Sequence, residues 1–215
     1  MSPPEGPRAV MGIEADGHAQ CLDAAARCLK EGGIVCYPTE TFYALGVLYD
    51  NHQGLERLAL LKGRPAGKAF PLIVGDFEML VSVAVEIDEL AQKLMASLWP
   101  GALTFVVRAR EGLSPYVKDA RETVAVRLPD SRFARHLSRE VGRPVTATSA
   151  NRAGASPARG VPDVRDHFPE GIDLIIDGGE SRANLPSTII EVRGGEVRLL
   201  REGAVPLSLI LSLAG

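Results

Sequence analysis

The sequence predicts an α/β fold with a twisted, mixed β-sheet and flanking helices. Short apolar runs of strand length alternate along the chain with segments whose apolar residues recur at helical spacing. Gly194-Gly195 separates two such runs and signals a β-hairpin, so antiparallel as well as parallel strands are expected. The 215 residues, 46% of them hydrophobic, suit one globular domain that needs no disulfide.

The expected helices are recognised by their spacing and by the residues that end them. The strongest pattern covers residues 87–98 and ends at Trp99-Pro100-Gly101. Glycines follow three others, because a glycine readily adopts the left-handed conformation that terminates a helix. These three helices span residues 22–29, 55–62 and 133–141. A short apolar helix at about residues 206–213 is expected to close the chain.

Strands are expected where short apolar or alternating runs lie between these helices and the turns. They cover residues 34–37, 71–74, 102–108, 123–128, 145–148, 173–177, 187–192 and 196–200. Alternation sorts the side chains of residues 123–127 by face: the two valines point one way, and Thr123, Ala125 and Arg127 point the other way.

The composition narrows the class of protein. A net charge of −3 argues against a protein that wraps nucleic acid, which needs a basic surface. The three cysteines, at positions 21, 28 and 36, form no CxxC pair and are expected to be reduced thiols of a cytoplasmic protein. No Cys/His cluster has zinc spacing, so no metal site is expected.

No domain boundary is visible within residues 13–215, which we expect to form a single catalytic domain. Residues 1–12 are rich in proline and glycine and are expected to form a flexible leader. No apolar run approaches the ~20 residues of a membrane span, and the N-terminus has no apolar signal core.

Several strand and helix ends carry cations and hydroxyl groups. Lys62, Arg64 and Lys68 lie within seven residues at a predicted helix end. Two explanations are open: the cations stabilise the negative end of the helix dipole, or they bind the phosphate groups of a ligand. The spacing is not that of a Walker A loop, since Ala69 stands where serine or threonine would bind magnesium.

Hydroxyl groups recur at other strand ends, in Ser149-Ala150-Asn151 and Ser187-Thr188, and Arg201 ends the last strand. Taken singly, the SAN stretch is better explained by an ordinary polar turn, and Ser187-Thr188 and Arg201 by ordinary strand ends. No GxSxG, HExxH or GxGxxG motif is present. Together the residues indicate an anion pocket, an open basic cleft at one edge of the sheet.

The same stretches, taken in order, resemble the YrdC-type L-threonylcarbamoyladenylate synthases in their short, single-domain form. The matching segments run from about Gly32 to Gly203 and cover most of the chain. They are PTETFY (38–43), KGRP (62–65), WPGALT (99–104), TVAVR (123–127), SAN (149–151), PSTI (186–189) and REG (201–203). The chain departs from the family pattern at Ala44, Ala153 and Glu191, and at Gly75-Asp76, where a histidine often stands.

The resemblance implies a YrdC-like fold and a nucleotidyltransferase activity. The implied reaction joins L-threonine, bicarbonate and ATP into threonylcarbamoyl-AMP and pyrophosphate, with Mg²⁺ accompanying the ATP. The adenylate would then supply a separate tRNA-modifying transferase complex that modifies adenosine 37 of certain tRNAs. A weak direct contact with RNA and no membrane association are also expected.

Residue roles follow from the resemblance, motif by motif. The implied catalytic cations are Lys62, Arg64 and Arg127. The residues implied to bind L-threonine are Thr41, Arg127, Ala147 and Ser187. The residues implied to bind ATP are Arg64, Lys68, Thr123, Ser149, Asn151, Ser156 and Arg201.

A divergent member of the family with an altered substrate remains possible because of the departures from the family pattern. Two alternative functions of other classes also remain open at this point. The first is an RNA-binding translation or rRNA-processing factor with a basic concave face, which would bind tRNA in a salt-dependent way without consuming ATP. The second is a carbamoyl-adenylate-forming enzyme of the hydrogenase-maturation type. Such enzymes are usually much longer and carry zinc-binding cysteines that this chain lacks.

Overall fold

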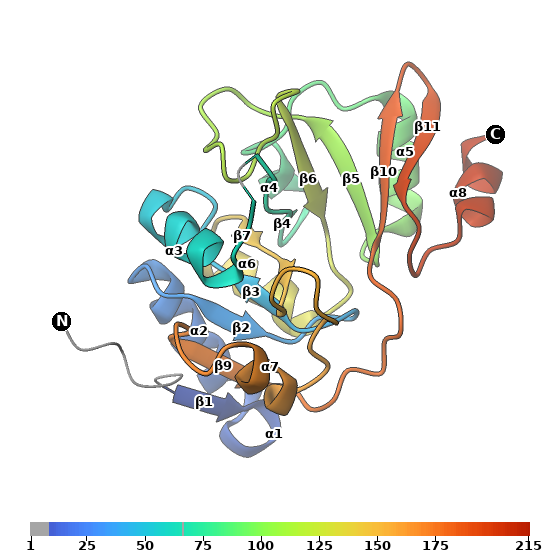
Figure 1. Ribbon diagram of the computed structural model, residues 1–215. Helices are drawn as coiled ribbons and strands as arrows, with labels where there is room; N and C mark the ends of the chain where they lie inside the picture. Colours follow the sequence, from blue (N-terminus) through green and yellow to red (C-terminus); the bar gives the residue numbers. More distant parts are fainter. Residues whose placement is uncertain (1–8, 66) are drawn as a thin grey trace.

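The computed structural model describes residues 9–65 and 67–215 of the chain. Within these residues the strands form two mixed sheets, a five-stranded sheet with the order β1-β9-β2-β3-β8 and a six-stranded sheet with the order β11-β10-β5-β6-β4-β7. The first sheet occupies the lower part of Figure 1 and the second the upper part. The predicted α/β class with flanking helices is confirmed, and its strands are divided between two sheets where the sequence indicated one.

The five-stranded sheet is built around β9 (Leu174–Asp177). Strands β1 (Ala9–Gly12) and β2 (Val35–Tyr37) lie parallel to β9 on either side, and β3 (Ala44–Gly46) pairs antiparallel with β2. Residues 9–12 were expected in a flexible leader, and this is wrong. They form β1, because their backbone pairs with the edge of β9 that β2 does not occupy. The rest of that expected leader lies outside the described residues.

The six-stranded sheet has β5 (Leu103–Arg108) near its centre. Strand β6 (Thr123–Arg127) pairs antiparallel with β5, and β10 (Thr188–Arg193) lies parallel to it on the other side. Strand β11 (Glu196–Arg201) forms the predicted hairpin with β10, and both turn glycines, Gly194 and Gly195, have positive φ. Strand β4 (Leu72–Ile73) lies beside β6.

The segment predicted as one strand, residues 145–148, passes from one sheet to the other. Its first part, β7 (Val145–Thr146), pairs with β4 of the six-stranded sheet. Its second part, β8 (Thr148–Ser149), pairs with β3 of the five-stranded sheet. Ala147 lies at the crossing point, where its N–H donates to the carbonyl of Pro71 at 2.8 Å.

Helices cover the outer faces of the sheets. Helices α2 (His18–Lys30) and α6 (Arg132–Val141) pack against each other, and α8 (Leu207–Ala214) lies beside β11 and α5 (Glu89–Leu98) (Figure 1). Helix α3 (His52–Lys62) ends at Gly63, as predicted. The sequence did not predict the short helices α1 (Ile13–Asp16), α4 (Phe77–Leu80) and α7 (Val161–His167). No helix of the described residues is long and apolar enough to cross a membrane.

Thr146 holds the two sheets together. Its backbone N–H donates to the carbonyl of Val47 at 2.9 Å, and its hydroxyl accepts from the N–H of Val47 at 3.0 Å. The buried hydroxyl of Tyr37, in the five-stranded sheet, donates to the Thr146 carbonyl at 2.8 Å. The Thr146 hydroxyl also donates to the carbonyl of Leu45 at 3.3 Å. Four hydrogen bonds thus join β7 to β2, to β3 and to the residue after β3 in a region closed to water, which fixes the angle at which the sheets meet.

Thr146→Val should lower the free energy of unfolding by about 1–3 kcal/mol, because the buried N–H of Val47 loses its acceptor while the side-chain volume is kept. Denaturant unfolding monitored by circular dichroism measures the change. Ser97→Ala, which removes an exposed hydroxyl bonded to the preceding helical turn, is the control and should be nearly neutral. A Thr146→Val variant as stable as Ser97→Ala would contradict this role.

Candidate active site

A cavity of about 400 Å³ opens where the two sheets meet. Its walls come from the loop after β2, the loop before β4, one face of the six-stranded sheet, the crossing segment at Ala147, and the approach to β10. The lining residues are Thr39, Thr41, Phe42, Tyr43, Ala44, Arg64, Lys68, Ala69, Pro71, Leu72, Thr104, Ala125, Arg127, Ala147, Thr148, Ser149, Pro157, Pro186, Ser187, Ile189 and Arg201.

Most of the residues predicted to form the site line this one cavity. From the predicted set it brings together Thr41, Arg64, Lys68, Arg127, Ala147, Ser149, Ser187 and Arg201. Phe42 and Tyr43 also form part of the wall. Segments more than a hundred residues apart therefore contribute cations and hydroxyl groups to a single hollow, an arrangement suited to a small anionic ligand.

Arg64 is held rigidly in the wall. Its guanidinium lies 4.3 Å from the centre of the Phe70 ring and donates to the carbonyls of Lys68 (2.7 Å) and Ala69. A further N–H donates to the hydroxyl of Thr148 at 3.3 Å. Burial lowers the pKa of Arg64 to about 10, which leaves the group charged at neutral pH. The stacked ring and the carbonyls fix the orientation of this cation before any ligand arrives.

Lys62 and Asn151 lie behind the wall. The Lys62 ammonium, buried among protein atoms, donates to the carbonyls of Ser149 and Asn151, the latter at 2.8 Å. The side-chain oxygen of Asn151 accepts from the Ser149 hydroxyl at 2.5 Å. These contacts hold the 149–151 loop in place, so among the described residues Lys62 and Asn151 support the lining residue Ser149 and do not line the cavity themselves.

Arg127 and Arg201 approach the cavity from β6 and β11. The Arg127 guanidinium is nearly buried and forms an ion pair with Glu40. Arg201 donates to the Ser187 carbonyl at 2.8 Å and to its hydroxyl at 3.1 Å. Burial, followed by the charge of Arg127, lowers the pKa of Arg201. The two cations are therefore close enough to repel each other, and an anion bound between them would relieve that repulsion.

Thr104 is a wall residue for which sequence analysis gave no role. Its hydroxyl, buried on β5, lies 2.9 Å from the hydroxyl of Ser187. The Ser187 oxygen accepts from Arg201 as well, so Thr104 and Arg201 together fix the position of that hydroxyl. Thr104 belongs to the WPGALT segment and lies on the sheet face that also carries Arg127. This shared face could have identified Thr104 as a site residue from the sequence.

Two other predicted residues lie away from this cavity. Ser156 is next to the lining residue Pro157, and its carbonyl lies 2.9 Å from the His167 ring nitrogen. Thr123 lies four residues from Arg127 at the opposite end of β6, about 13 Å along an extended strand. Any ligand that contacts both Thr123 and Arg127 must therefore extend along the face of the sheet.

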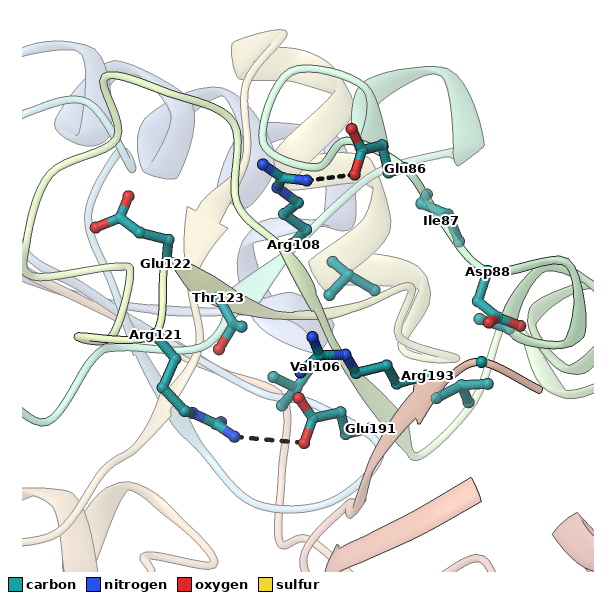
Figure 2. A pocket seen from close by; sticks show the side chains of 14 residues that line it. Glu86, Ile87, Asp88, Val106, Arg108, Arg121, Glu122, Thr123, Glu191 and Arg193 are labelled. Carbon is teal, nitrogen blue, oxygen red and sulfur yellow. Dashed lines mark hydrogen bonds and ion pairs between the residues drawn. The ribbon is translucent and has the colours of Figure 1, made fainter. Parts of the chain in front are cut away.

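Thr123 lines a second hollow of about 470 Å³ on the same sheet face (Figure 2). Its lining carries charges of both signs, and two pairs of them are in contact: Arg121 with Glu191 at 3.4 Å, and Arg108 with Glu86 at 2.5 Å. In contrast, the charged residues lining the first cavity are all cations. An anion is therefore attracted more strongly to the first cavity than to this hollow.

Gly75, the first of the two residues where the family often carries a histidine, leaves no room for a side chain. A Cβ atom at Gly75 would lie 3.0 Å from the backbone nitrogen of Arg139 in α6 and 3.2 Å from the carbonyl of Arg135. The next residue, Asp76, turns its carboxylate to the N–H of Met79 at the start of α4. Among the described residues, neither Gly75 nor Asp76 lines the cavity.

Comparisons with known proteins place the chain in a family. The Sua5/YciO/YrdC family model, described as "Telomere recombination", matches residues 27–203. The chain belongs to this family. It is 37% identical over 191 residues to a Threonylcarbamoyl-AMP synthase of Pyrococcus abyssi, covering 89% of this chain and 56% of that protein. It is also 35% identical to a Threonylcarbamoyl-AMP synthase of Nitrosococcus oceani, and this alignment covers 80% of this chain and 93% of that protein.

The solved structure of P. abyssi Sua5 complexed with L-threonine superposes with a TM-score of 0.90 at 34% identity, covering 96% of this chain and 61% of that one. The family resemblance inferred from the motifs is thereby confirmed. This chain spans little more than half the length of the P. abyssi proteins and nearly the whole length of the N. oceani relative.

The affinity of the cavity for a polyphosphate anion, with ATP as the probe, is predicted to fall as the pH rises above about 8. Burial, with smaller contributions from the charges of Arg64 and Lys68, lowers the pKa of Lys62 to about 8. Below that pH Lys62 is protonated and adds positive charge behind Ser149; above it the charge is lost. A unit charge about 10 Å from a phosphate is worth about 1.5 kcal/mol at an effective dielectric constant near 20, or roughly a tenfold change in affinity.

Isothermal titration calorimetry with ATP between about pH 7 and pH 9.5 measures this effect. The Lys62→Met variant should bind ATP with an affinity that barely changes over the same range, because it lacks the titrating group. An equally steep loss of affinity in Lys62→Met would assign the titration to another residue.

Proposed function

We propose that this protein is an L-threonylcarbamoyladenylate synthase, a nucleotidyltransferase that forms threonylcarbamoyl-AMP and pyrophosphate from L-threonine, bicarbonate and ATP. The observation that carries the proposal is the convergence of Arg64, Arg127 and Arg201 with the hydroxyls of Thr41 and Ser187 on one cavity. The names of the relatives and the L-threonine complex of P. abyssi Sua5 support it.

The proposed chemistry needs no protein nucleophile. The amine of L-threonine combines with bicarbonate, losing water, to give an N-carboxylate. A carboxylate oxygen of this carbamate then attacks the α-phosphorus of ATP. A new P–O bond forms, the bond from the α-phosphorus to the bridging oxygen breaks, and pyrophosphate leaves with the bonding electrons. The protein's contributions are positioning and neutralisation of charge.

The cavity offers suitable groups for each substrate. The Arg127 guanidinium matches the carboxylate of an amino acid, and the hydroxyls of Thr41 and Ser187 match its hydroxyl or amine. Arg64, Lys68 and Arg201 face the cavity and are suited to the negative charge of the triphosphate. The aromatic wall at Phe42 and Tyr43 excludes water from the carbamate, which decomposes readily in bulk solvent.

The wall is less suited to a metal ion held by the protein. No aspartate or glutamate is among the described lining residues, and the described residues contain no group of three potential metal ligands. Hard divalent cations prefer oxygen ligands, often carboxylates and phosphates. The Mg²⁺ that we propose to accompany ATP would therefore be held by phosphate oxygens and water, with no dedicated protein ligand among these residues.

In the cell, the adenylate would be handed to a separate transferase complex that modifies adenosine 37 of tRNA, and we place this step in the cytoplasm. The mixed anhydride between a carbamate and AMP is an activated acyl donor, so an amine acceptor such as the adenine N6 is chemically appropriate. The product must remain sheltered from water until that transfer.

The defining experiment measures pyrophosphate release by the purified protein with ATP, bicarbonate and individual amino acids. We expect release that requires both bicarbonate and L-threonine, and a product that carries label from bicarbonate. Salt-dependent tRNA binding without any ATP consumption would instead favour the RNA-binding alternative. Release with no amino acid would contradict the proposal.

Arg127→Ala should reduce kcat/KM for L-threonine by about 100-fold or more, since two charge-assisted hydrogen bonds of about 1.5–3 kcal/mol each are lost. Its KM for ATP should change much less. Arg143→Ala, which removes an exposed arginine paired with Asp50 outside the cavity, is the matched control. Near-normal threonine kinetics in a folded Arg127→Ala variant would remove the carboxylate-binding role.

A further inference from the structure

Glu40 occupies a particular position beside the cavity. Its neighbours Thr39 and Thr41 both line the cavity, whereas among the described lining residues Glu40 is absent. Its carboxylate contacts the guanidinium of Arg127 through Oε1. The other oxygen, Oε2, accepts a hydrogen bond from the backbone N–H of Ser131 at 3.2 Å. Glu40 therefore holds Arg127 without itself being one of the described lining residues.

The carboxylate is itself anchored by the protein. Ser131 is the N-cap of helix α6, where backbone N–H groups and the helix dipole favour a negative charge. The Ser131 hydroxyl donates to the carbonyl of Pro38 at 3.1 Å, which ties the 38–41 loop to the same helix end. Both carboxylate oxygens are thus in use, and the side chain is only 18% exposed.

A guanidinium is a planar fork with several N–H donors, so it can bind one carboxylate along one edge and a second along another. The contact with Glu40 involves Nη1 of Arg127. Because Arg127 also lines the cavity, its remaining N–H groups are available to a ligand there. Glu40 also affects the charge of the site, because its carboxylate offsets part of the repulsion between Arg127 and Arg201. After burial, this repulsion is the second cause of the lowered pKa of Arg201.

We propose that Glu40 is a positioning residue for the reaction, orienting Arg127 so that its free edge binds the carboxylate of the amino acid substrate. This inference rests on the proposed function and adds to it a residue that acts through Arg127. In this arrangement helix α6 holds Glu40, Glu40 holds Arg127, and Arg127 binds the substrate. Each contact removes rotational freedom from the next group, so less entropy is lost when the substrate binds.

Two other roles for Glu40 predict different effects of its removal. If Glu40 competed with the substrate for Arg127, its removal would free the guanidinium and tighten binding. If Glu40 only stabilised the fold, its removal would lower stability and affect both substrates alike. The effects of Glu40 variants on L-threonine and ATP, measured separately, distinguish these roles from positioning.

The test uses Glu40→Gln, which keeps the shape and removes the charge, and Glu40→Asp, which keeps the charge and shortens the side chain by one methylene. The matched control is Asp130→Asn, a carboxylate near the same helix end that pairs with Arg135 outside the cavity. Calorimetry gives the L-threonine affinity without ATP, steady-state kinetics gives KM for each substrate, and thermal unfolding monitors folding.

Positioning predicts that Glu40→Gln weakens L-threonine binding by about tenfold or more, while KM for ATP changes by less than about twofold, because only the carboxylate-binding group is disturbed. Glu40→Asp should lie between Glu40→Gln and the wild type, and Asp130→Asn should match the wild type. If Glu40→Gln does not fold, the charged Glu40→Asp variant alone must show the selective loss for L-threonine.

Unchanged or tighter L-threonine binding in Glu40→Gln would overturn the positioning role, as would equal losses for L-threonine and ATP. These results would leave the proposed function standing, because the wild type would still form the adenylate. A wild-type protein that neither binds L-threonine nor releases pyrophosphate would overturn the proposed function, and the role of Glu40 with it.

Discussion

The site depends on holding like-charged guanidinium groups together in a partly buried cavity. Such groups repel each other and lose hydration on burial, so each one needs a partner supplied by the fold. Arg64 has the carbonyls of Lys68 and Ala69 and the ring of Phe70, Arg201 has the carbonyl of Ser187, and Arg127 has the carboxylate of Glu40. Most of these partners are backbone carbonyls, which carry no full charge. The cavity therefore keeps a net positive character that an anionic substrate can neutralise.

The two-sheet architecture explains why these partners are in the right places. The crossing segment passes from β7 to β8 at Ala147, and that residue lies in the cavity wall. The hydrogen bonds of Thr146 fix the junction, and the loops after β2 and before β4 reach the cavity from either side of it. The hairpin of β10 and β11 brings Arg201 back to Ser187. Long-range strand pairing, more than any local motif, gives the cavity its shape.

Much of this arrangement could be predicted from the sequence. Alternation in residues 123–127 correctly placed Arg127 on one face with Ala125, and both line the cavity. Gly63 and Gly142 ended their helices as expected. Strand β1 was missed because four residues after a Pro/Gly-rich stretch form a strand only through pairing with β9. The division into two sheets has no local signal, since it occurs within a five-residue segment. Glu40 was likewise overlooked as a site residue, because its partners Arg127 and Ser131 are about ninety positions away.

The most direct test of the central claim is a crystal structure of the protein with L-threonine bound. The account predicts that the amino acid lies in the cavity between the two sheets, with its carboxylate against the edge of Arg127 not used by Glu40 and with its polar groups near the hydroxyls of Thr41 and Ser187. L-Threonine bound outside this cavity, or inside it with its carboxylate away from Arg127, would contradict the account.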